Sequence, residues 1–428
     1  MLAVARKPRI LLVTTGPLLP PNSGGRIYTW GTTAPLRDEF EYHLIAVMTA
    51  AERAEFAQKR ELLEDEYRSV FASWQFFDRP ELPGHMRRRD ALRHLVFHTK
   101  HRLPLMDVSY YSSEVVAAAR RVVSEAGIDL IEVDHAEMAY VRRFLPSTPA
   151  VLVNHNIEGD LHPFWMTKRW SLPERLVWRA FAGLSRRNTH NVELRNSYLF
   201  SAKLFISPVD AARVDDACPK VVVPLPMPTK EVERRPGQRL RLLWLGGMDW
   251  PPNLEGVRWL LTQVVPILRR APGHPIELHV VGGHPPHEVQ ACDDGDMIRV
   301  HGYVEDVGRF TETCDVLVAP IFTGSGVNVK VVEALASGMV VVTTRLGLSG
   351  LAATPGRDLL VADTAQQFAA AVIGLAQDPV RLRRLGESAL SYVQNNHDPS
   401  RVTAIKSAAL RRVLSGSGQA HATYGGDI

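Results

Sequence analysis

The chain has 428 residues, a length that predicts two or three domains rather than a single core. Its hydrophobic content of 45% and charged content of 22% are typical of a globular protein. The formal net charge of +4 suits an anionic small ligand or an acidic membrane surface, but it is too small to predict binding to nucleic acid.

The three cysteines, Cys218, Cys292 and Cys314, lie far apart in the sequence. Their number is odd, and their spacing is neither that of a metal site nor that of a disulfide framework. We therefore expect a reducing, cytoplasmic environment and no bound metal. We also expect no signal peptide and no transmembrane segment, because no apolar run is long enough to span a bilayer.

The N-terminal part of the chain alternates apolar runs with helical stretches. The first run lies within Arg9–Thr15 and ends at glycine and proline, as strands of a parallel sheet covered on both faces do. Further strands are predicted at residues 42–47, 130–133, 150–154 and 204–207, and a helix at residues 113–126. This alternation predicts a parallel α/β domain over residues 1–223.

Residues 51–105 are predicted to be a helical insertion between early strands. This segment combines a basic stretch, Arg87–Arg89, with aromatic residues such as Trp74 and Phe97. Basic amphipathic segments can lie on anionic membranes or bind lipid phosphates, so peripheral contact with the inner membrane face is one interpretation. A solvated helical face is the simpler alternative.

A proline-rich segment, residues 224–238, is predicted to be a linker between domains. The α/β pattern then restarts and predicts a second domain over residues 239–395. Its strands are expected at residues 240–245, 277–281, 297–301, 316–319 and 340–343, and its helices at residues 253–270, 364–376 and 379–395. Residues 396–414 are expected to form a C-terminal helix, and the Gly/Ser-rich residues 415–428 a disordered tail.

Glycines follow several of these strands, namely Gly24, Gly25, Gly246, Gly324 and Gly326. In open α/β sheets, ligands bind beyond the carboxyl ends of the strands, where a chain without side-chain bulk lets backbone N–H groups approach closely. An ordinary βα turn also contains glycine, so each of these positions alone is weak evidence for a site. The recurrence of such glycines after several strands of one chain is stronger evidence for a ligand site.

The segment Gly324–Gly338 is predicted to be a glycine-rich loop followed by a helix. The loop residues are Gly324, Ser325, Gly326, Val327 and Asn328. Lys330 adds a positive charge near the helix N-terminus, which predicts a phosphate or diphosphate site. Glu333 shares a helix face with Lys330 and can accept hydrogen bonds from a sugar diol. The alternative is an exposed helical ion pair between these two residues.

These segments together resemble a divergent branch of the retaining family 4 of GT-B glycosyltransferases. The resemblance covers most of the chain and is strongest between Leu242 and Asn395. It rests on segments that have the family's order and spacing, namely Pro21–Gly25, Asn154–Glu158, Leu243–Asn253, Val300–Val307, Cys314–Pro320 and Gly324–Gly338.

The resemblance implies the GT-B fold, an α/β architecture of two Rossmann-like parallel-sheet domains that face an interdomain cleft. It implies transfer of a sugar from a nucleotide-sugar donor, with a UDP- or GDP-sugar expected, to an unknown hydroxyl acceptor with retention at the anomeric carbon. It further implies a role in cell-surface glycan or secondary-metabolite glycosylation, with no cofactor and no obligatory metal. The first domain would bind the acceptor and the second the donor, and the last helix would pack back on the first domain.

The resemblance also implies roles for individual residues. Backbone groups near Val304 would hold the nucleobase, and Glu333 would bind the donor ribose. Gly24 and Gly25 would meet the donor phosphates. Lys330 would stabilise the charge that grows on the leaving diphosphate.

The chain departs from the family pattern at three positions. Many relatives have a second glutamate where this chain has Ser325, and an arginine and a lysine where it has Gly247 and Pro252. Two alternatives therefore stay open: a catalytically silent partner protein of the same fold, and a sugar-nucleotide epimerase. A nicotinamide-dependent dehydrogenase is disfavoured, because no Gly-x-Gly-x-x-Gly follows the first strand.

Two histidines that follow predicted strands are candidates for the acceptor side. With Lys330, His135 is a candidate catalytic residue, placed to position or deprotonate the acceptor hydroxyl. Asp134 would orient His135 or cap the next helix. His155 is a second candidate for the same task, and a purely structural role is the alternative for each histidine.

Overall fold

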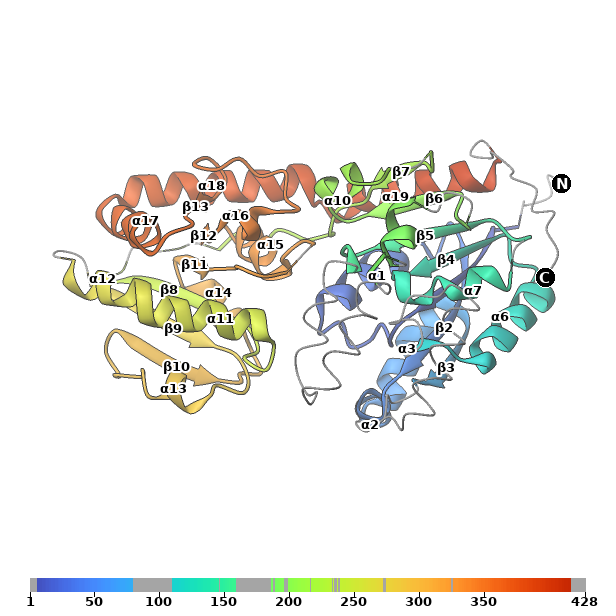
Figure 1. Cartoon of the computed structure of the whole chain (residues 1–428), viewed down its shortest axis with the longest axis horizontal. Helices are drawn as coiled ribbons and strands as arrows, with labels where there is room; N and C mark the ends of the chain where they lie inside the picture. Colours follow the sequence, from blue (N-terminus) through green and yellow to red (C-terminus); the bar gives the residue numbers. More distant parts are fainter. Residues whose placement is uncertain are drawn as a thin grey trace. The chain divides into compact units, whose positions relative to one another are not determined.

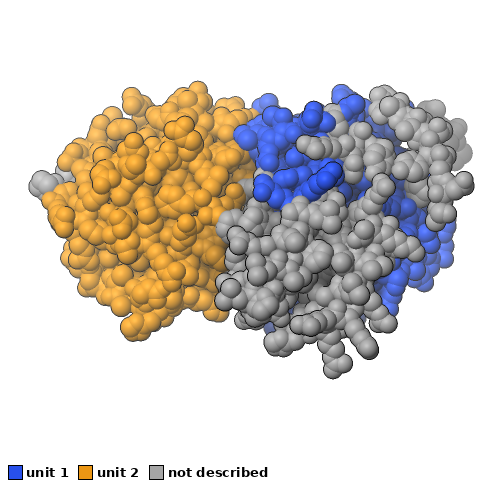
Figure 2. All heavy atoms as spheres, in the orientation of Figure 1, with its two compact units in different colours: residues 1–224, 400–428 blue, residues 225–399 orange. Residues whose placement is uncertain are grey.

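The computed structural model describes residues 6–79, 110–145, 147–158, 186–187, 189–195, 199–215, 217–232, 234, 237, 239–271, 275–324 and 326–416. Internal contacts divide the chain into unit 1, Met1–Pro224 with Ser400–Ile428, and unit 2, Leu225–Pro399. Figure 1 shows the helices and strands, and Figure 2 colours the two units. Each unit is built on a parallel sheet covered by helices, which confirms the predicted α/β class.

Unit 1 contains a seven-stranded sheet in the order β3-β2-β1-β4-β5-β6-β7, in which each described strand pair is parallel. The strands are β1 (Arg9–Thr14), β2 (Glu41–Met48), β3 (Phe71–Asp78), β4 (Leu130–Asp134), β5 (Ala150–Asn154), β6 (Ala202–Phe205) and β7 (Lys220–Val222). The order of strands along the chain reverses between β1 and β4, and such a switch point is where open α/β sheets bind ligands.

Helices cover both faces of this sheet. They are α1 (Gly24–Thr33), α2 (Ala50–Gln58), α3 (Arg60–Val70), α6 (Ser113–Ala126), α7 (Tyr140–Arg143), α10 (Pro208–Ala212) and α19 (Pro399–Leu414), with short turns η1 (Ala34–Leu36), η2 (Ala136–Met138) and η3 (Asn191–Arg195). Successive strand residues point to opposite faces. Leu11 and Val13 of β1 therefore pack in the core beside α6, whereas Ile10 and Leu12 pack in the core that includes Leu410 of α19.

Helix α6 has the bounds that its sequence predicts, because capping residues mark both ends. The Ser112 hydroxyl accepts a hydrogen bond from the backbone N–H of Val115 at 3.4 Å. Gly127 ends the helix in the left-handed conformation with φ of 62°.

The structure corrects the predicted insertion at residues 51–105. Its first part forms α2, α3 and the edge strand β3, which pairs with β2. Trp74 and Phe76 of β3 pack against the core of unit 1, so these aromatic side chains stabilise the sheet. Residues 80–105, including Arg87–Arg89 and Phe97, lie outside the described residues. Among the helices that are described, none combines the length and the apolar character needed to cross a bilayer.

Helix α19 packs within unit 1 through a buried ion pair. The Lys406 ammonium lies 2.6 Å from Glu132 Oε1, and both side chains are 1% exposed. The same ammonium donates to the hydroxyls of Thr32 and Thr33 at 3.3 and 3.1 Å. The C-terminal helix is thereby tied both to β4 and to α1.

Unit 2 contains a six-stranded sheet in the order β10-β9-β8-β11-β12-β13, again paired in parallel where it is described. The strands are β8 (Leu240–Leu245), β9 (Ile276–Val281), β10 (Ile298–Gly302), β11 (Val316–Ala319), β12 (Val340–Thr343) and β13 (Leu360–Val361). Its helices are α11 (Pro251–Trp259), η5 (Leu260–Val264), α12 (Val265–Arg270), α13 (His287–Gln290), α14 (Gly308–Thr313), α15 (Val329–Ala336), α16 (Arg345–Leu348), α17 (Ala365–Gln377) and α18 (Pro379–Asn396).

Two expectations for this unit need correction. The helix predicted at residues 253–270 contains the π-helical turn η5. Pro266, the second residue after this turn, has no N–H to donate. The expected linker at residues 224–238 packs on unit 2 in its described part. Arg234 donates to the carbonyls of Cys314 and Thr311 at 3.0 and 2.6 Å.

Candidate functional site

In unit 2, three loops at the carboxyl ends of neighbouring strands are bonded to one another. Gly246 donates its N–H to Val281 at 3.0 Å, and Gly282 donates to Gly302 at 2.8 Å. A Cβ atom on Gly282 would lie 1.9 Å from the carbonyl oxygen of Gly246, so only glycine fits there. The glycines after β8 and β9 therefore allow the loops to close up at the edge of the sheet.

Lys330, the second residue of α15, reaches the carboxyl end of β8. Its ammonium donates to the carbonyl of Leu245 at 2.9 Å and to Asn253 Oδ1 at 2.9 Å. It also lies 5.6 Å from the centre of the Trp244 ring. Burial lowers the pKa of Lys330 to about 8, and no described carboxylate offsets this effect. A half-buried cation beside glycine turns and without a described countercharge is suited to bind an anion.

Asn253 holds the glycine turn that faces Lys330. Its Nδ2 donates to the carbonyl of Gly247 at 2.9 Å, while its Oδ1 accepts from Lys330. A Cβ atom on Gly246 would lie 2.8 Å from the Asn253 amide, which explains the glycine at that position. Asn253 is a site residue that no sequence motif indicated.

Glu333 lies one turn after Lys330 and is not paired with it. The carboxylate is half-buried, burial raises its pKa, and it has no ionic or hydrogen-bond partner among the described residues. The alternative of an exposed Lys330–Glu333 ion pair is therefore wrong. Both side chains are left available to a ligand.

The remaining predicted donor residues follow the carboxyl ends of β10 and β11 in unit 2. Gly324 and Gly326 have positive φ angles of 136° and 75°, and Asn328 is the N-cap of α15 without a side-chain capping bond. Val327, between them, is half-buried. Val304 is half-buried and follows the end of β10. Ser325 lies outside the described residues.

In unit 1, the carboxylate of Asp134 is the centre of a buried hydrogen-bond cluster at the end of β4. Thr14 and Thr29 donate their hydroxyls to Oδ2 at 3.0 and 2.9 Å. His155 Nε2 lies 2.7 Å from Oδ1, and His135 Nδ1 lies 3.2 Å from Oδ2. Burial alone would favour the neutral acid, but the two histidines outweigh it and hold the pKa of Asp134 well below its ordinary value.

His135 projects from this cluster in a strained backbone conformation. Its φ of 76° lies in a region that side chains other than glycine rarely occupy, at a cost of roughly 1–3 kcal/mol. Burial opposes charge on the ring, but Asp134 outweighs this effect and raises the pKa of His135 to about 9. The side chain is then an imidazolium near neutral pH, which favours a positioning or charge-stabilising role over that of a base.

His155 has a different place in the cluster. Its side chain is 5% exposed, and its ring stacks on that of His135 with a centroid distance of 3.9 Å. Burial and the charge on His135 lower the pKa of His155. His155 is thus a neutral supporting residue, and of the two histidines His135 is the one that lines a cavity.

Gly24 and Gly25 form the first residues of α1, with Ser23 as N-cap. A Cβ atom on Gly25 would lie 3.4 Å from His135 Nε2 and 3.7 Å from His155 Nδ1. The structure therefore brings the predicted glycine loop against the predicted catalytic histidine. The N-terminus of α1 and the imidazolium are both positive, so they attract an anion jointly.

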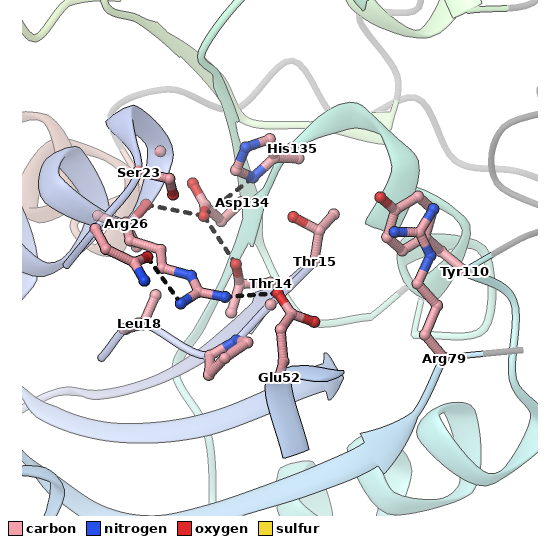
Figure 3. Close-up of a pocket in the computed structure, with 15 residues that line it drawn as sticks. Thr14, Thr15, Leu18, Ser23, Arg26, Glu52, Arg79, Tyr110, Asp134 and His135 are labelled. Carbon is pink, nitrogen blue, oxygen red and sulfur yellow. Dashed lines mark hydrogen bonds and ion pairs between the residues drawn. The ribbon is translucent and has the colours of Figure 1, made fainter. Parts of the chain in front are cut away.

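A cavity of about 350 Å³ opens over this cluster at the switch point between β1 and β4 (Figure 3). Its lining residues come from β1 and the loop after it, α1, α2, the end of β3, the segment before α6 and the end of β4. They are Thr14, Thr15, Gly16, Pro17, Leu18, Asn22, Ser23, Gly25, Arg26, Thr29, Glu52, Arg79, Tyr110, Asp134 and His135. Sequence reasoning missed Arg26, Glu52, Arg79 and Tyr110. The available signal for Arg79 was its place directly after a strand, but that strand was not predicted.

Asp134, His135 and His155 also place ligand-type atoms within 4.8 Å of one another. Oδ1 of Asp134 and Nε2 of His155 are 2.7 Å apart, closer than two ligands of one tetrahedral zinc ion, which lie more than about 3 Å apart. The two rings stack rather than converge on a point. The geometry fits a cluster that shares protons better than a metal site.

Comparisons with known proteins agree with this architecture. Residues 239–378 match the family described as glycosyl transferases group 1. A phosphatidyl-myo-inositol mannosyltransferase of Mycolicibacterium smegmatis is 27% identical over 264 residues, which are 59% of each chain. An uncharacterized 44.6 kDa protein in the cps region of Klebsiella pneumoniae is 25% identical over 170 residues, 38% of this chain and 43% of that protein. The matches thus span about half the length of these curated relatives.

Among solved structures, Anabaena HepE in complex with UDP superimposes with a TM-score of 0.62 at 13% identity, over 94% of this chain and 99% of that chain. HepE is also known in complex with UDP-glucose. The likeness covers nearly the whole chain and establishes the GT-B fold, with two parallel-sheet α/β units.

Proposed function

We propose that this protein is a retaining glycosyltransferase that moves a sugar from a nucleoside diphosphate donor to a hydroxyl acceptor. Unit 2 would bind the donor without an obligatory metal or cofactor, and unit 1 would bind the acceptor. The match of residues 239–378 to a glycosyltransferase family supports the reaction class. The complexes of HepE with UDP and UDP-glucose support a uridine donor as the first to test.

The observation that carries the proposal is the place of Lys330. Its ammonium is held at the carboxyl end of β8 by Leu245 and Asn253 and has no described countercharge. Cleavage of the bond between a sugar and a diphosphate builds negative charge on the leaving oxygens. A half-buried cation that is already oriented stabilises this charge more as it grows than in the ground state.

Neighbouring residues fit the rest of a nucleotide-sugar. The N–H groups of Gly326 and Val327 precede α15, so they would face the diphosphate at a helix N-terminus. The unpartnered carboxylate of Glu333 would accept hydrogen bonds from the ribose diol. Backbone groups near Val304, next to the end of β10, would hold the base.

The acceptor would react in the cavity of unit 1. His135, charged through its contact with Asp134, would donate a hydrogen bond to an acceptor or sugar oxygen. Because its proton is retained near neutral pH, the acceptor proton would pass to a diphosphate oxygen of the donor. The acceptor oxygen forms the new glycosidic bond, the bond between the sugar and the diphosphate breaks, and the leaving diphosphate takes the proton.

Because the chain lacks charged residues that many relatives have, a catalytically silent partner protein is the alternative function. The positions of the family's arginine and lysine are Gly247 and Pro252, and Asn253 with Lys330 fills the adjacent space. We propose that Lys330 supplies the cation otherwise missing, and that the enzyme is active.

Calorimetry with UDP, GDP, dTDP and ADP in the presence of EDTA tests the donor site. At least one should bind with a micromolar dissociation constant, roughly −8 kcal/mol. Incubation of the corresponding nucleotide-sugars with acceptor mixtures, followed by product and anomer analysis, then tests transfer and retention. Binding without any turnover would favour the silent partner, and the failure of all four nucleotides to bind would remove the donor site.

A further inference from the structure

The cavity of unit 1 carries one cationic side chain that the hydrogen-bond clusters around it do not use. Arg26 is paired with Glu52, whose Oε1 lies 2.5 Å from the guanidinium, and His135 is paired with Asp134. Arg79 lines the same cavity and forms neither an ion pair nor a side-chain hydrogen bond with any residue that the structure describes. The charged groups that line the cavity thus leave one positive charge uncompensated.

Arg79 is held in place by an aromatic ring instead of a carboxylate. Its Cζ lies 3.9 Å from the centre of the Tyr110 ring, a cation–π contact that fixes the plane of the guanidinium. The backbone carbonyl of Tyr110 accepts a hydrogen bond from the Tyr140 hydroxyl at 2.9 Å, and Tyr110 packs against the core that includes Tyr140 of α7. The N–H groups at the edge of the guanidinium remain free to bind an oxyanion through two hydrogen bonds.

Arg79 lies across the cavity from the N-terminus of α1 (Figure 3). Figure 3 shows Arg79 and Tyr110 on the opposite side of the pocket from Ser23 and Arg26, with Thr15 between the two groups. No described residue bonds to the side-chain hydroxyls of Thr15 and Ser23, so both can bind hydroxyl groups of a ligand. A cavity of about 350 Å³ is at the small end of ligand sites, with room for one sugar-sized molecule.

We propose that this cavity selects an acceptor that carries an anionic group, a carboxylate or a phosphate, and that Arg79 binds this group while the acceptor hydroxyl lies near His135. This inference rests on the proposed sugar transfer and adds the substrate class to it. Arg79 is then a specificity-determining residue that contacts the acceptor away from the bond that forms.

The test compares three probes that differ in charge: glucose, glucuronate and glucose 6-phosphate. Their binding to the full chain is measured by saturation-transfer NMR titration, with and without UDP. At least one anionic probe should bind roughly tenfold or more tightly than glucose, because hydrogen bonds between charged groups are stronger than neutral ones. Preference for glucuronate would identify a carboxylate, and preference for glucose 6-phosphate a phosphate.

Arg79→Gln removes the charge but keeps much of the side-chain length, and it should abolish the preference for the anionic probe. Arg79→Lys should restore part of it. Arg120→Gln is the matched control, since Arg120 also lies over an aromatic ring of unit 1, 5.7 Å from the centre of Phe144, but does not line the cavity. The control should keep the full preference.

Equal affinity for all three probes, or a preference that survives in Arg79→Gln, would overturn the inference. The same is true if neither anionic probe binds. Nucleotide binding is measured in parallel on each variant. If the anionic probe binds through Arg79 but no nucleotide binds, the proposed function is wrong and the anion subsite stands. If a nucleotide binds but the anionic probe does not bind through Arg79, only the anion subsite is wrong.

Discussion

The imidazole rings of His135 and His155 stack at a centroid distance of 3.9 Å and 7° from parallel, and both contact the carboxylate of Asp134. Two stacked rings at this distance cannot both be positively charged imidazolium ions without strong repulsion. The pKa of His135 is raised to about 9 and that of His155 is lowered, so one positive charge is assigned to the ring that lines the cavity.

The raised pKa of His135 predicts a dependence of the stability of unit 1 on pH. The folded-state pKa of about 9 lies above the ordinary value of 6.5. The stabilisation of the folded state by the pairing of charged His135 with Asp134 is therefore fully present below pH 6.5, and it is lost as the pH rises from 6.5 to 9. Its upper bound is about 3 kcal/mol. Urea unfolding should show that the free energy of unfolding of wild type falls more steeply over this window than that of His135→Asn; parallel curves would contradict the pairing with Asp134.

The same histidine should matter for sugar transfer but not for donor binding. His135→Ala should leave nucleotide affinity within a few fold and reduce transfer by about 10²-fold, the scale of a positioned acid, base or donor group. His43→Ala is a control, since His43 lies on β2 of the same unit and bonds to Ser73 instead of the cavity cluster. Loss of nucleotide binding together with a lower melting temperature would indicate a structural histidine.

Lys330 and Glu333 should have separable kinetic effects. Lys330→Ala should lower kcat more than Glu333→Gln does, because charge on the leaving diphosphate increases in the transition state. Glu333→Gln should mainly raise the KM for the donor, since a ribose contact is nearly the same in the ground and transition states. Steady-state kinetics with saturating acceptor measures both effects, and a reversal of the two phenotypes would show that the assigned roles are wrong.

Much of the fold was predictable because its signals are local. The strand bounds at residues 150–154 and 316–319 and the helix bounds at 113–126 follow from apolar runs and caps, and the structure reproduces them. Strand β3 was missed because it follows two charged helices and carries several aromatic residues, which resembled an amphipathic insertion. β3 packs on the core because it pairs with β2, and a local sequence pattern does not predict which strands pair.

The site was predictable only where its residues are close in sequence. Lys330, Glu333 and the glycines of their loop lie in one segment, so a single pattern indicated all of them. The Asp134 cluster takes Thr14, Thr29, His135 and His155 from four separate segments. The pairing of Lys330 with Asn253 joins residues 77 positions apart. Such contacts follow from the order of strands in the sheet, which no local pattern specifies.

Nucleotide affinity should depend on the protonation of Lys330. Burial lowers its pKa to about 8, so the side chain loses its charge as the pH rises above that value. An anionic diphosphate binds the charged form, so affinity for the best nucleotide should fall above pH 8, by up to about tenfold per pH unit. Calorimetry from pH 7 to 9.5 measures this slope. Lys330→Met should bind weakly with no such slope, whereas Lys230→Met, which removes an exposed lysine paired with Glu312, should keep it.

The buried ion pair of Lys406 and Glu132 should hold α19 on unit 1. Lys406→Met leaves Glu132 buried without its partner, and burial already raises the pKa of that carboxyl. Removing one member of a buried pair costs roughly 3–5 kcal/mol, while replacing both with apolar groups of similar size is often neutral. Urea unfolding should therefore show a large loss in Lys406→Met and a substantial recovery in the double variant Lys406→Met/Glu132→Leu. If the double variant were as unstable as the sum of the single variants, the two side chains would not act as a pair. Arg411→Met, which removes an exposed contact of the same helix with Glu39, is the control and should cost less than about 1 kcal/mol.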